Sequence, residues 1–245
     1  MLLRKQFEHS PVAARVAPFI VFLLLTFCQG QFGEASRYGF YLAKTLVGAW
    51  LIFEMRPFVS EMRAAFSWEA FAVGVGVVVM WVGIDGWYPS LNEIGRSVLN
   101  PILKVIGLES WSLKPSSAAP PWNPHLQFGN GAALAWFFIA VRILGPSLVV
   151  PALEEVFFRS FLYRYIAKAD FLSVPLGQFI ALPFFVVSAV FAFEHEQWLA
   201  GLLCGFAYQG LVIWKKRLGD AIVAHGITNF LLGVWVVGKG AWQFW

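Results

Sequence analysis

The chain has 245 residues and a formal net charge of +4, and hydrophobic residues make up 59% of it, whereas charged residues make up only 13%. Soluble domains carry about 25% charged residues, so this composition, with a mean hydropathy of +0.67, excludes a soluble nucleic-acid binder, a coiled coil and a disordered chain. It predicts an all-α, polytopic membrane protein whose small basic excess faces anionic lipid headgroups. Cys28 and Cys204 lie in apolar runs and provide neither a disulfide framework nor a CxxC metal pair.

The first candidate membrane span covers Val16–Gln29 and follows Arg4, Lys5 and Arg15. A crossing helix needs about 20 mostly apolar residues, and this segment with its flanks approaches that length. A cleaved signal peptide is the alternative, but Phe27 stands where cleavage requires a small residue. We therefore expect a retained helix.

Two further apolar segments follow at Tyr38–Met55, which contains Lys44, and at Trp68–Trp87. The next segment, Ser90–Leu108, has apolar residues at helical spacing and a polar opposite face, so we expect it to lie in the membrane interface rather than to cross. Lys114–Gly131 is rich in Pro, Ser and Gly and is the only linker-like segment.

The C-terminal half contains five helical candidates. They are Gly131–Val150, Leu153–Lys168, Val174–Phe193, Trp198–Trp214 and Ala221–Val237. The second of these carries several charges among aromatic residues, so the count is seven clear spans plus one charged helix. The prediction is a transmembrane bundle of seven to eight helices with a polar intramembrane cavity. Residues 1–127 supply the N-terminal spans, interfacial helix and linker, and residues 128–245 form the helical core of one integral membrane domain.

The membrane orientation stays open at this point. Lys215, Lys216 and Arg217 favour a cytoplasmic position for the loop before the last span, and the basic N-terminus favours the cytoplasm as well. With eight crossings these two indications conflict. They agree only if the charged helix, or one other segment, does not cross separately.

The first chemically informative pattern is the EExxxR sequence from Glu154 to Arg159. Glu155 and Arg159 are four residues apart on a predicted helix, so they share a face and can form an ion pair. Glu154 is rotated by about 100° from Glu155 and needs another partner. Ionisable groups within apolar spans are costly and indicate function, although a charged helix end at the interface is an equally good interpretation of this pattern alone.

Two histidines lie in apolar segments further along the chain. His195 follows Phe191 by four residues, and an interfacial histidine in a short turn is the simpler explanation of this pair. His225 and Asn229 share one face of the last predicted span. A hydrogen-bonded contact between helices explains that pair at least as well as catalysis, and Gly226 would permit close packing there.

The ordered set EExxxR, FxxxH and HxxxN on hydrophobic helices resembles the CAAX protease and bacteriocin-processing family (CPBP, or Abi) of intramembrane endopeptidases. The resemblance covers about residues 130–238, and the first half of the chain carries no motif of this family. In length and general character the chain is also similar to the CAAX-protease-related branch that is encoded alongside bacterial exosortase systems.

The resemblance implies an endopeptidase in which Glu154 and His195 activate a water molecule for attack on a peptide carbonyl. It implies that His225 and Asn229 stabilise the oxyanion, and that Glu155 and Arg159 support the site. The implied partners are a membrane-associated protein or peptide substrate and the lipid bilayer, with no nucleic acid and no cofactor. The implied location is a bacterial inner membrane, in which the chain is a multi-pass protein.

Three alternatives remain. Zinc could be held by Glu154, His195 and His225, but no HExxH sequence is present, so we favour a metal-free mechanism. A non-catalytic immunity or assembly partner could retain the fold, although all six polar motif positions are occupied. A proton-coupled transporter could use the same Glu and His residues as a relay, but no inverted repeat is visible in the sequence.

Overall fold

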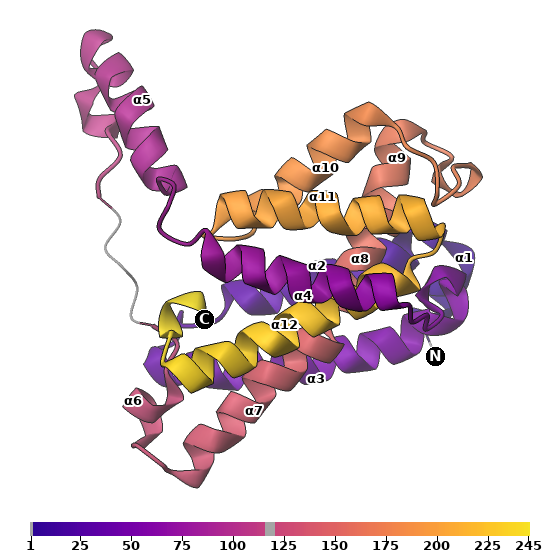
Figure 1. Ribbon diagram of the computed structural model, residues 1–245, viewed down its shortest axis with the longest axis horizontal. Helices are drawn as coiled ribbons and strands as arrows, with labels where there is room; N and C mark the ends of the chain where they lie inside the picture. Colours follow the sequence, from indigo (N-terminus) through magenta and orange to yellow (C-terminus); the bar gives the residue numbers. More distant parts are fainter. Residues whose placement is uncertain (1, 116–120) are drawn as a thin grey trace.

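The computed structural model describes residues 2–115 and 121–245, and within these ranges it contains helices and no strand. The elements form one bundle, from which α5 projects as a separate arm (Figure 1). Residues 116–120 of the predicted linker lie outside the described ranges. The all-helical class predicted from the composition is confirmed.

The N-terminal half supplies five α-helices. They are α1 (Leu2–His9), α2 (Pro11–Phe27), α3 (Glu34–Met55), α4 (Trp68–Gly83) and α5 (Leu91–Val105), with short 3-10 turns η1 (Arg56–Phe58), η2 (Ser60–Met62) and η3 (Glu109–Trp111). Ser10 and Ser67 start α2 and α4, because each hydroxyl accepts a hydrogen bond from a backbone N–H three residues later. All three N-terminal spans predicted from apolar length are therefore helices.

The C-terminal half supplies the remaining elements. They are α6 (Pro124–Phe128), α7 (Ala133–Leu148), α8 (Val150–Glu155), the π-helix η4 (Val156–Leu162), α9 (Tyr163–Ala167), η5 (Phe171–Ser173), α10 (Ala181–Phe193), α11 (Trp198–Lys215), α12 (Gly219–Lys239) and η6 (Trp242–Phe244). α10 begins later than the predicted Val174 because residues 174–180 form a turn followed by extended backbone at Ile180. The Tyr163 hydroxyl accepts from the N–H of Ile180 at 2.8 Å and donates to the carbonyl of Gln178 at 2.9 Å.

The prediction of two separate helices at Gly131–Val150 and Leu153–Lys168 is wrong. Ala133–Ala167 is one helical stretch of 35 residues. Pro151 lies in the first turn of α8, where a missing N–H is tolerated, and Val149 before it keeps right-handed helical backbone angles. Glu154 consequently lies inside a long element and not at the start of a helix.

The bundle is a polytopic membrane fold. Two elements, Ala133–Ala167 and Gly219–Lys239, are long and apolar enough to cross a membrane, and Pro11–Phe27, Trp68–Gly83 and Ala181–Phe193 are shorter apolar helices. Small residues let these helices approach closely, as packing within lipid requires. A Cβ atom added to Gly205 of α11 would lie 3.0 Å from Cα of Ser188 on α10, and one added to Gly74 of α4 would lie 2.7 Å from the carbonyl of Ala224 on α12.

The two basic segments that gave conflicting topology indications lie at the same end of the bundle. Arg4 pairs with Glu54 at 2.7 Å, and Lys215 pairs with Glu69 at 3.1 Å, so both segments meet the connection between α3 and α4. Because α7–α9 is a single element, the described chain contains seven long elements, and the loop before α12 returns to the N-terminal side. We call this the basic end; Figure 1 shows the N-terminus there.

α5 is the segment that the sequence places at the membrane interface. It has no buried residue, and a capping box formed by Ser90 and Glu93 fixes its start. Val98, Ile102 and Val105 of its apolar face are exposed. The structure contains no bilayer, so the interfacial position of α5 stays a prediction.

Candidate active site

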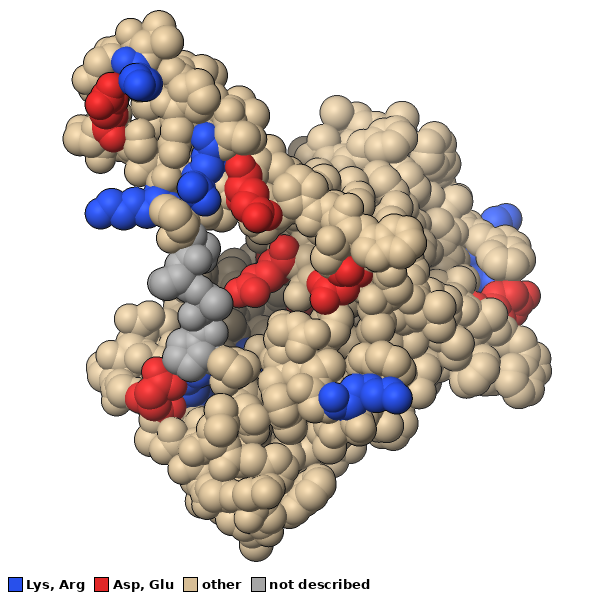
Figure 2. All heavy atoms as spheres, turned by 60° about the vertical axis from the view of Figure 1, so that its left-hand side comes forward, with Lys and Arg blue, Asp and Glu red and all other residues tan. Residues whose placement is uncertain are grey.

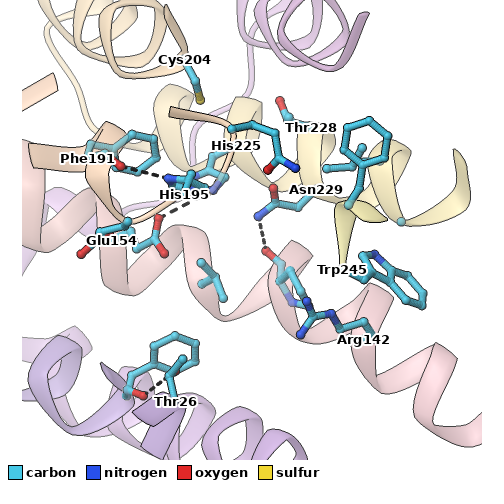
Figure 3. A pocket seen from close by; sticks show the side chains of 18 of the residues that line it. Thr26, Arg142, Glu154, Phe191, His195, Cys204, His225, Thr228, Asn229 and Trp245 are labelled. Atoms are coloured by element: carbon cyan, nitrogen blue, oxygen red, sulfur yellow. Dashed lines mark hydrogen bonds and ion pairs between the residues drawn. The ribbon is translucent and has the colours of Figure 1, made fainter. Parts of the chain in front are cut away.

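A cavity of about 320 Å³ lies within the bundle, lined by residues of α2, α3, α4, α7–α8, α10, α11 and α12. Glu154, His195, His225 and Asn229 all line it, and Figure 3 shows these four side chains together with the neighbouring Phe191. The four residues come from three segments that are separated in sequence. The fold thus brings the four predicted site residues together, and their catalytic roles stay predictions.

Glu154 is 9% exposed and projects from α8 into the cavity. Its Oε2 lies 3.9 Å from Nε2 of His225, which makes His225 the partner that the sequence left unidentified. That oxygen has no hydrogen-bond partner among the described residues. A buried carboxylate oxygen without a donor has room to accept a hydrogen bond from a water molecule or a ligand.

Glu155 and Arg159 form the predicted ion pair, with 3.2 Å between Oε2 of Glu155 and Nε of Arg159. Arg159 is 1% exposed, and its guanidinium lies 4.4 Å from the centre of the Phe191 ring. The other Glu155 oxygen, Oε1, lies 2.9 Å from Nδ1 of His225. Sequence reasoning did not predict this second contact, through which Glu155 connects Arg159 to the motif on α12.

The π-helix η4 begins directly after Glu155 and contains Arg159. π-helical turns are rare and occur frequently at functional sites, because the wider turn changes the direction of the side chains that follow. Most residues of η4, including Arg159, are buried in the bundle. The EExxxR motif therefore crosses a local change of helix type, which its spacing alone does not reveal.

His195 lies two residues after the end of α10, and its ring is held by Phe191, the other residue of the FxxxH motif. Its Nδ1 lies 2.9 Å from the carbonyl oxygen of Phe191. A carbonyl can only accept, so this contact assigns the proton to Nδ1 and leaves a lone pair on Nε2. The ring also meets Trp81 edge-on, with 5.2 Å between ring centres.

His225 lies between two carboxylates, Glu155 at Nδ1 and Glu154 at Nε2. The 2.9 Å contact with Glu155 is a hydrogen bond, whereas the 3.9 Å separation from Glu154 is too long for one and is an electrostatic contact. Tyr208 of α11 stacks on this ring with centres 5.0 Å apart, and its hydroxyl donates to Oγ1 of Thr228 at 2.7 Å. Gly226 lies against α7, since a Cβ atom there would be 2.7 Å from the carbonyl of Ser147. The ring is thus held from three sides.

Asn229 donates through Nδ2 to the carbonyl of Pro146 on α7 at 2.9 Å, as Figure 3 shows. This bond uses one of the two amide hydrogens and fixes the side chain at the cavity wall. His225 and Asn229 therefore connect α12 to neighbouring helices, as the structural interpretation of their motif expects. Both also line the cavity, so the two interpretations are compatible.

The described residues contain no group of three His, Cys, Asp or Glu side chains arranged to hold a metal ion. Of the three residues considered as zinc ligands, His225 directs one nitrogen to Glu155 at 2.9 Å, and His195 directs one nitrogen to a backbone carbonyl. Metal independence itself stays a prediction that a chelator experiment can test.

A second buried ionic cluster lies on the same long helical element, toward the basic end. Glu61 accepts from Arg15 at 2.8 Å and from Arg164 at 2.6 Å, and Ser160 donates to it at 3.0 Å. Burial alone raises the pKa of Glu61, but the Arg15 and Arg164 guanidinium groups outweigh that effect and hold its pKa at about 2. The sequence analysis used Arg15 only as a basic residue that precedes the first span, and the structure places it in this cluster, where it is 3% exposed.

Residues 134–231, which include all three motifs, match the family model described as type II CAAX prenyl endopeptidase Rce1-like. The chain matches no curated protein and no solved structure. The matched region begins in α7 and ends in α12, so it contains every element that carries a predicted catalytic residue. The narrower exosortase-associated branch is not addressed by this match.

Proposed function

We propose that the chain, whose residues 134–231 match the Rce1-like family of CAAX prenyl endopeptidases, is a glutamate-dependent intramembrane endopeptidase. The family implies membrane-embedded protease activity in general. The observation that carries the specific mechanism is the meeting of Glu154, His195, His225 and Asn229 at one buried cavity. Burying four such groups is costly unless they serve one another or a ligand.

Glu154 and His195 activate the water molecule in this proposal. The unpartnered Oε2 of Glu154 takes a proton from water, while the Nε2 lone pair of His195 accepts the second hydrogen and orients it. The hydroxide oxygen forms a bond to the substrate carbonyl carbon. The proton held on Glu154 then passes to the leaving amide nitrogen as the carbon–nitrogen bond breaks.

His225 and Asn229 stabilise the negative oxygen of the tetrahedral intermediate. The second N–H of Asn229 is not used by Pro146, and Nε2 of His225, which faces Glu154 and the cavity, serves as the second donor when it carries a proton. Preorganised donors of this kind contribute about 3 kcal/mol each in a dry site. Glu155 and Arg159 are positioning residues, since Glu155 holds His225 and Arg159 holds Glu155.

The basic end identifies the cytoplasmic side, because cytoplasmic loops of membrane proteins carry the excess of Lys and Arg. The cavity is also lined by Gln197 and Trp245, which follow the ends of α10 and α12 away from the basic end. We infer that substrates reach the cavity from the non-cytoplasmic side. The substrate is a membrane-associated protein or peptide, and the membrane is a bacterial inner membrane.

The decisive test uses the purified full chain in lipid nanodiscs with a pool of apolar fluorogenic peptides. Wild-type protein should cleave members of the pool, and Glu154→Gln should abolish cleavage. Glu196→Gln is the matched control, because Glu196 is an exposed carboxylate outside the cavity. Binding without any turnover by wild-type protein would instead indicate a non-catalytic partner.

A chelator experiment tests the metal-free part of the proposal. Activity should survive incubation with EDTA or 1,10-phenanthroline, because Glu154 and His195 supply the base and the acceptor that the water needs. Activity that is lost with the chelator and restored by zinc would make Glu154, His195 and His225 metal ligands.

A further inference from the structure

Two basic side chains line the active-site cavity without a role in the proposed chemistry. Lys44 projects from α3 and Arg142 from α7. Lys44 is ten residues from the start of α3 and Arg142 is nine from the start of α7, so both lie about 14 Å from the end of the bundle opposite the basic end. They occupy the stretch of the cavity between that end and Glu154.

Neither cation forms an ion pair with a carboxylate in the described part of the chain. Lys44 is 7% exposed, and its Nζ donates to Oγ1 of Thr26 at 3.1 Å. A buried cation within a membrane span costs several kcal/mol. One hydroxyl partner offsets only part of that cost. Glu154 and Glu194 also line the cavity, but neither lies within ion-pair distance of Lys44 or Arg142, so both cations keep the capacity to bind an anion directly.

Aromatic rings surround both cations. Lys44 Nζ lies 4.8 Å from the centre of the Phe22 ring and 4.6 Å from that of Tyr41. The Arg142 guanidinium lies 4.5 Å from the Tyr41 ring and 5.0 Å from the Trp122 ring. Cation–π contacts stabilise a buried cation less than a full counter-ion does, and the rings orient the cations while excluding water. Tyr41 contacts both cations, and both line the same cavity.

We propose that Lys44 and Arg142 form an anion subsite that binds a carboxylate group of the substrate. The planar guanidinium of Arg142 matches a carboxylate with two parallel hydrogen bonds, and Lys44 adds a point charge. The proposal rests on the proposed protease function, because the substrate is the peptide that this function requires. A lipid phosphate is the competing source of negative charge and is an outcome of the test.

The subsite adjoins the predicted oxyanion donor. Arg142 lies one helical turn before Pro146, whose carbonyl holds the Asn229 side chain. Figure 3 shows Arg142 on the same side of the cavity as Asn229 and Trp245. A carboxylate bound between the two cations therefore fixes the peptide at one point, while the peptide bond to be cleaved lies deeper, near Glu154. The subsite selects the substrate and sets the position of the cut.

The test compares matched peptides on the full chain in phosphatidylcholine nanodiscs. In the first pair of apolar fluorogenic peptides, one member ends in a free carboxylate and the other in an amide. In the second pair, one member has an internal Glu and the other has Gln at the same position. Wild-type kcat/KM should favour the carboxylate member of one pair by about 10- to 100-fold, the range expected for a hydrogen bond to a charged group. The pair that responds identifies the source of the carboxylate.

Lys44→Gln and Arg142→Gln should each reduce the carboxylate-to-amide ratio toward one. Arg142→Lys, which keeps the charge but loses the planar fork, should give an intermediate ratio and provides a second variant if Arg142→Gln does not fold. Lys239→Gln is the matched control, because Lys239 also lies over an aromatic ring, Trp235 at 5.5 Å, but is outside the cavity. A wild-type ratio near one in both peptide pairs would overturn the proposal.

A binding experiment separates this proposal from the protease mechanism. In Glu154→Gln protein, the carboxylate peptide should bind about 10- to 100-fold more tightly than its amide, and Lys44→Gln in that background should remove the difference. This result combined with no wild-type cleavage would reject the protease and retain the subsite. Phosphatidylglycerol nanodiscs supply the lipid arm. If the acid and amide peptides bind equally well in phosphatidylglycerol nanodiscs, the lipid phosphate occupies the subsite. That result would assign the subsite to the lipid and overturn the proposal.

Discussion

Two buried ionic clusters each include residues of the long α7–α9 element, and they differ in how many of their polar atoms form hydrogen bonds. At the basic end, both oxygens of Glu61 accept hydrogen bonds, and Ser160 bridges Arg15 and Arg164. At the cavity, Oε2 of Glu154 and Nη1 of Arg159 have no hydrogen-bond partner among the described residues. The first cluster is saturated and closed, and the second retains capacity for a ligand.

The contrast separates a structural role from a reactive one. A buried network whose members are all satisfied rigidifies a fold, whereas one with a free acceptor at a cavity can receive a substrate or water. Figure 2 shows acidic side chains beside a hollow beneath the projecting arm, and basic side chains on the arm itself. If the contrast is correct, substitutions in the cavity cluster should affect turnover, and substitutions in the Glu61 cluster should affect folding.

The largest expected effect is on catalysis. His195→Ala should remove cleavage about as completely as Glu154→Gln, because residues that act as a unit are not additive in their effects. The double variant should be no worse than either single one. Thermal melting of all three in detergent should remain near that of wild type, since His195 makes its hydrogen bond to the backbone of its own turn. A double variant far below both singles would contradict the shared role.

Asn229→Ala should have a smaller effect on the same reaction. Loss of one oxyanion donor costs about 100- to 1000-fold in kcat and leaves water activation intact. The substitution also removes the bond to Pro146, so melting temperature must be measured alongside kcat. Thr228→Ser is a suitable control on the same helix, because it keeps the hydroxyl that Tyr208 uses. A lower melting temperature with unchanged kcat would show that Asn229 has only a structural role.

Sequence predicted the helices and the local pairs well because both depend on neighbouring residues. α11 and α12 begin and end within two residues of the predicted bounds, and Glu155 pairs with Arg159 because four residues make one turn. The continuity of α7–α9 was missed because the charged residues of Leu153–Lys168 set that segment apart from the apolar run before it. The contact from Glu155 to His225 joins residues 70 positions apart, and no local pattern encodes it.

The same reasoning explains which site residues were missed. Lys44 and Arg142 each appear in sequence as a single basic residue within an apolar run, and only the tertiary fold places both beside Tyr41. Glu61 lies in a short turn with no motif around it, so its two arginine partners could not be inferred. The signal available from sequence was the cost of a charge within a span, which identifies such a residue as functional but names no partner.

The Glu61 cluster should respond to substitution through stability. Glu61→Gln leaves Arg15 and Arg164 without a buried counter-ion, and breaking such a pair costs about 3–5 kcal/mol. Chemical unfolding in mixed micelles should show this loss, whereas kcat of the remaining folded protein should stay near wild type. Glu8→Gln provides the control, because Glu8 is exposed near the same end. A large loss of kcat in folded Glu61→Gln protein would remove the distinction between the two clusters.

Lowering the pH should gradually reduce the contribution of the Glu61 cluster to the free energy of unfolding. Because the folded-state pKa of Glu61 is about 2, against the ordinary 4.5, its ionised form stabilises the fold at every pH above the ordinary value. That contribution should decline as the pH falls from about 4.5 to about 2, when the unfolded chain takes up a proton before the folded one does. The difference in unfolding free energy between wild type and Glu61→Gln should therefore be constant above pH 5 and shrink below pH 4.5. A difference that grows on acidification would show that Glu61 is not the ionised centre of the cluster.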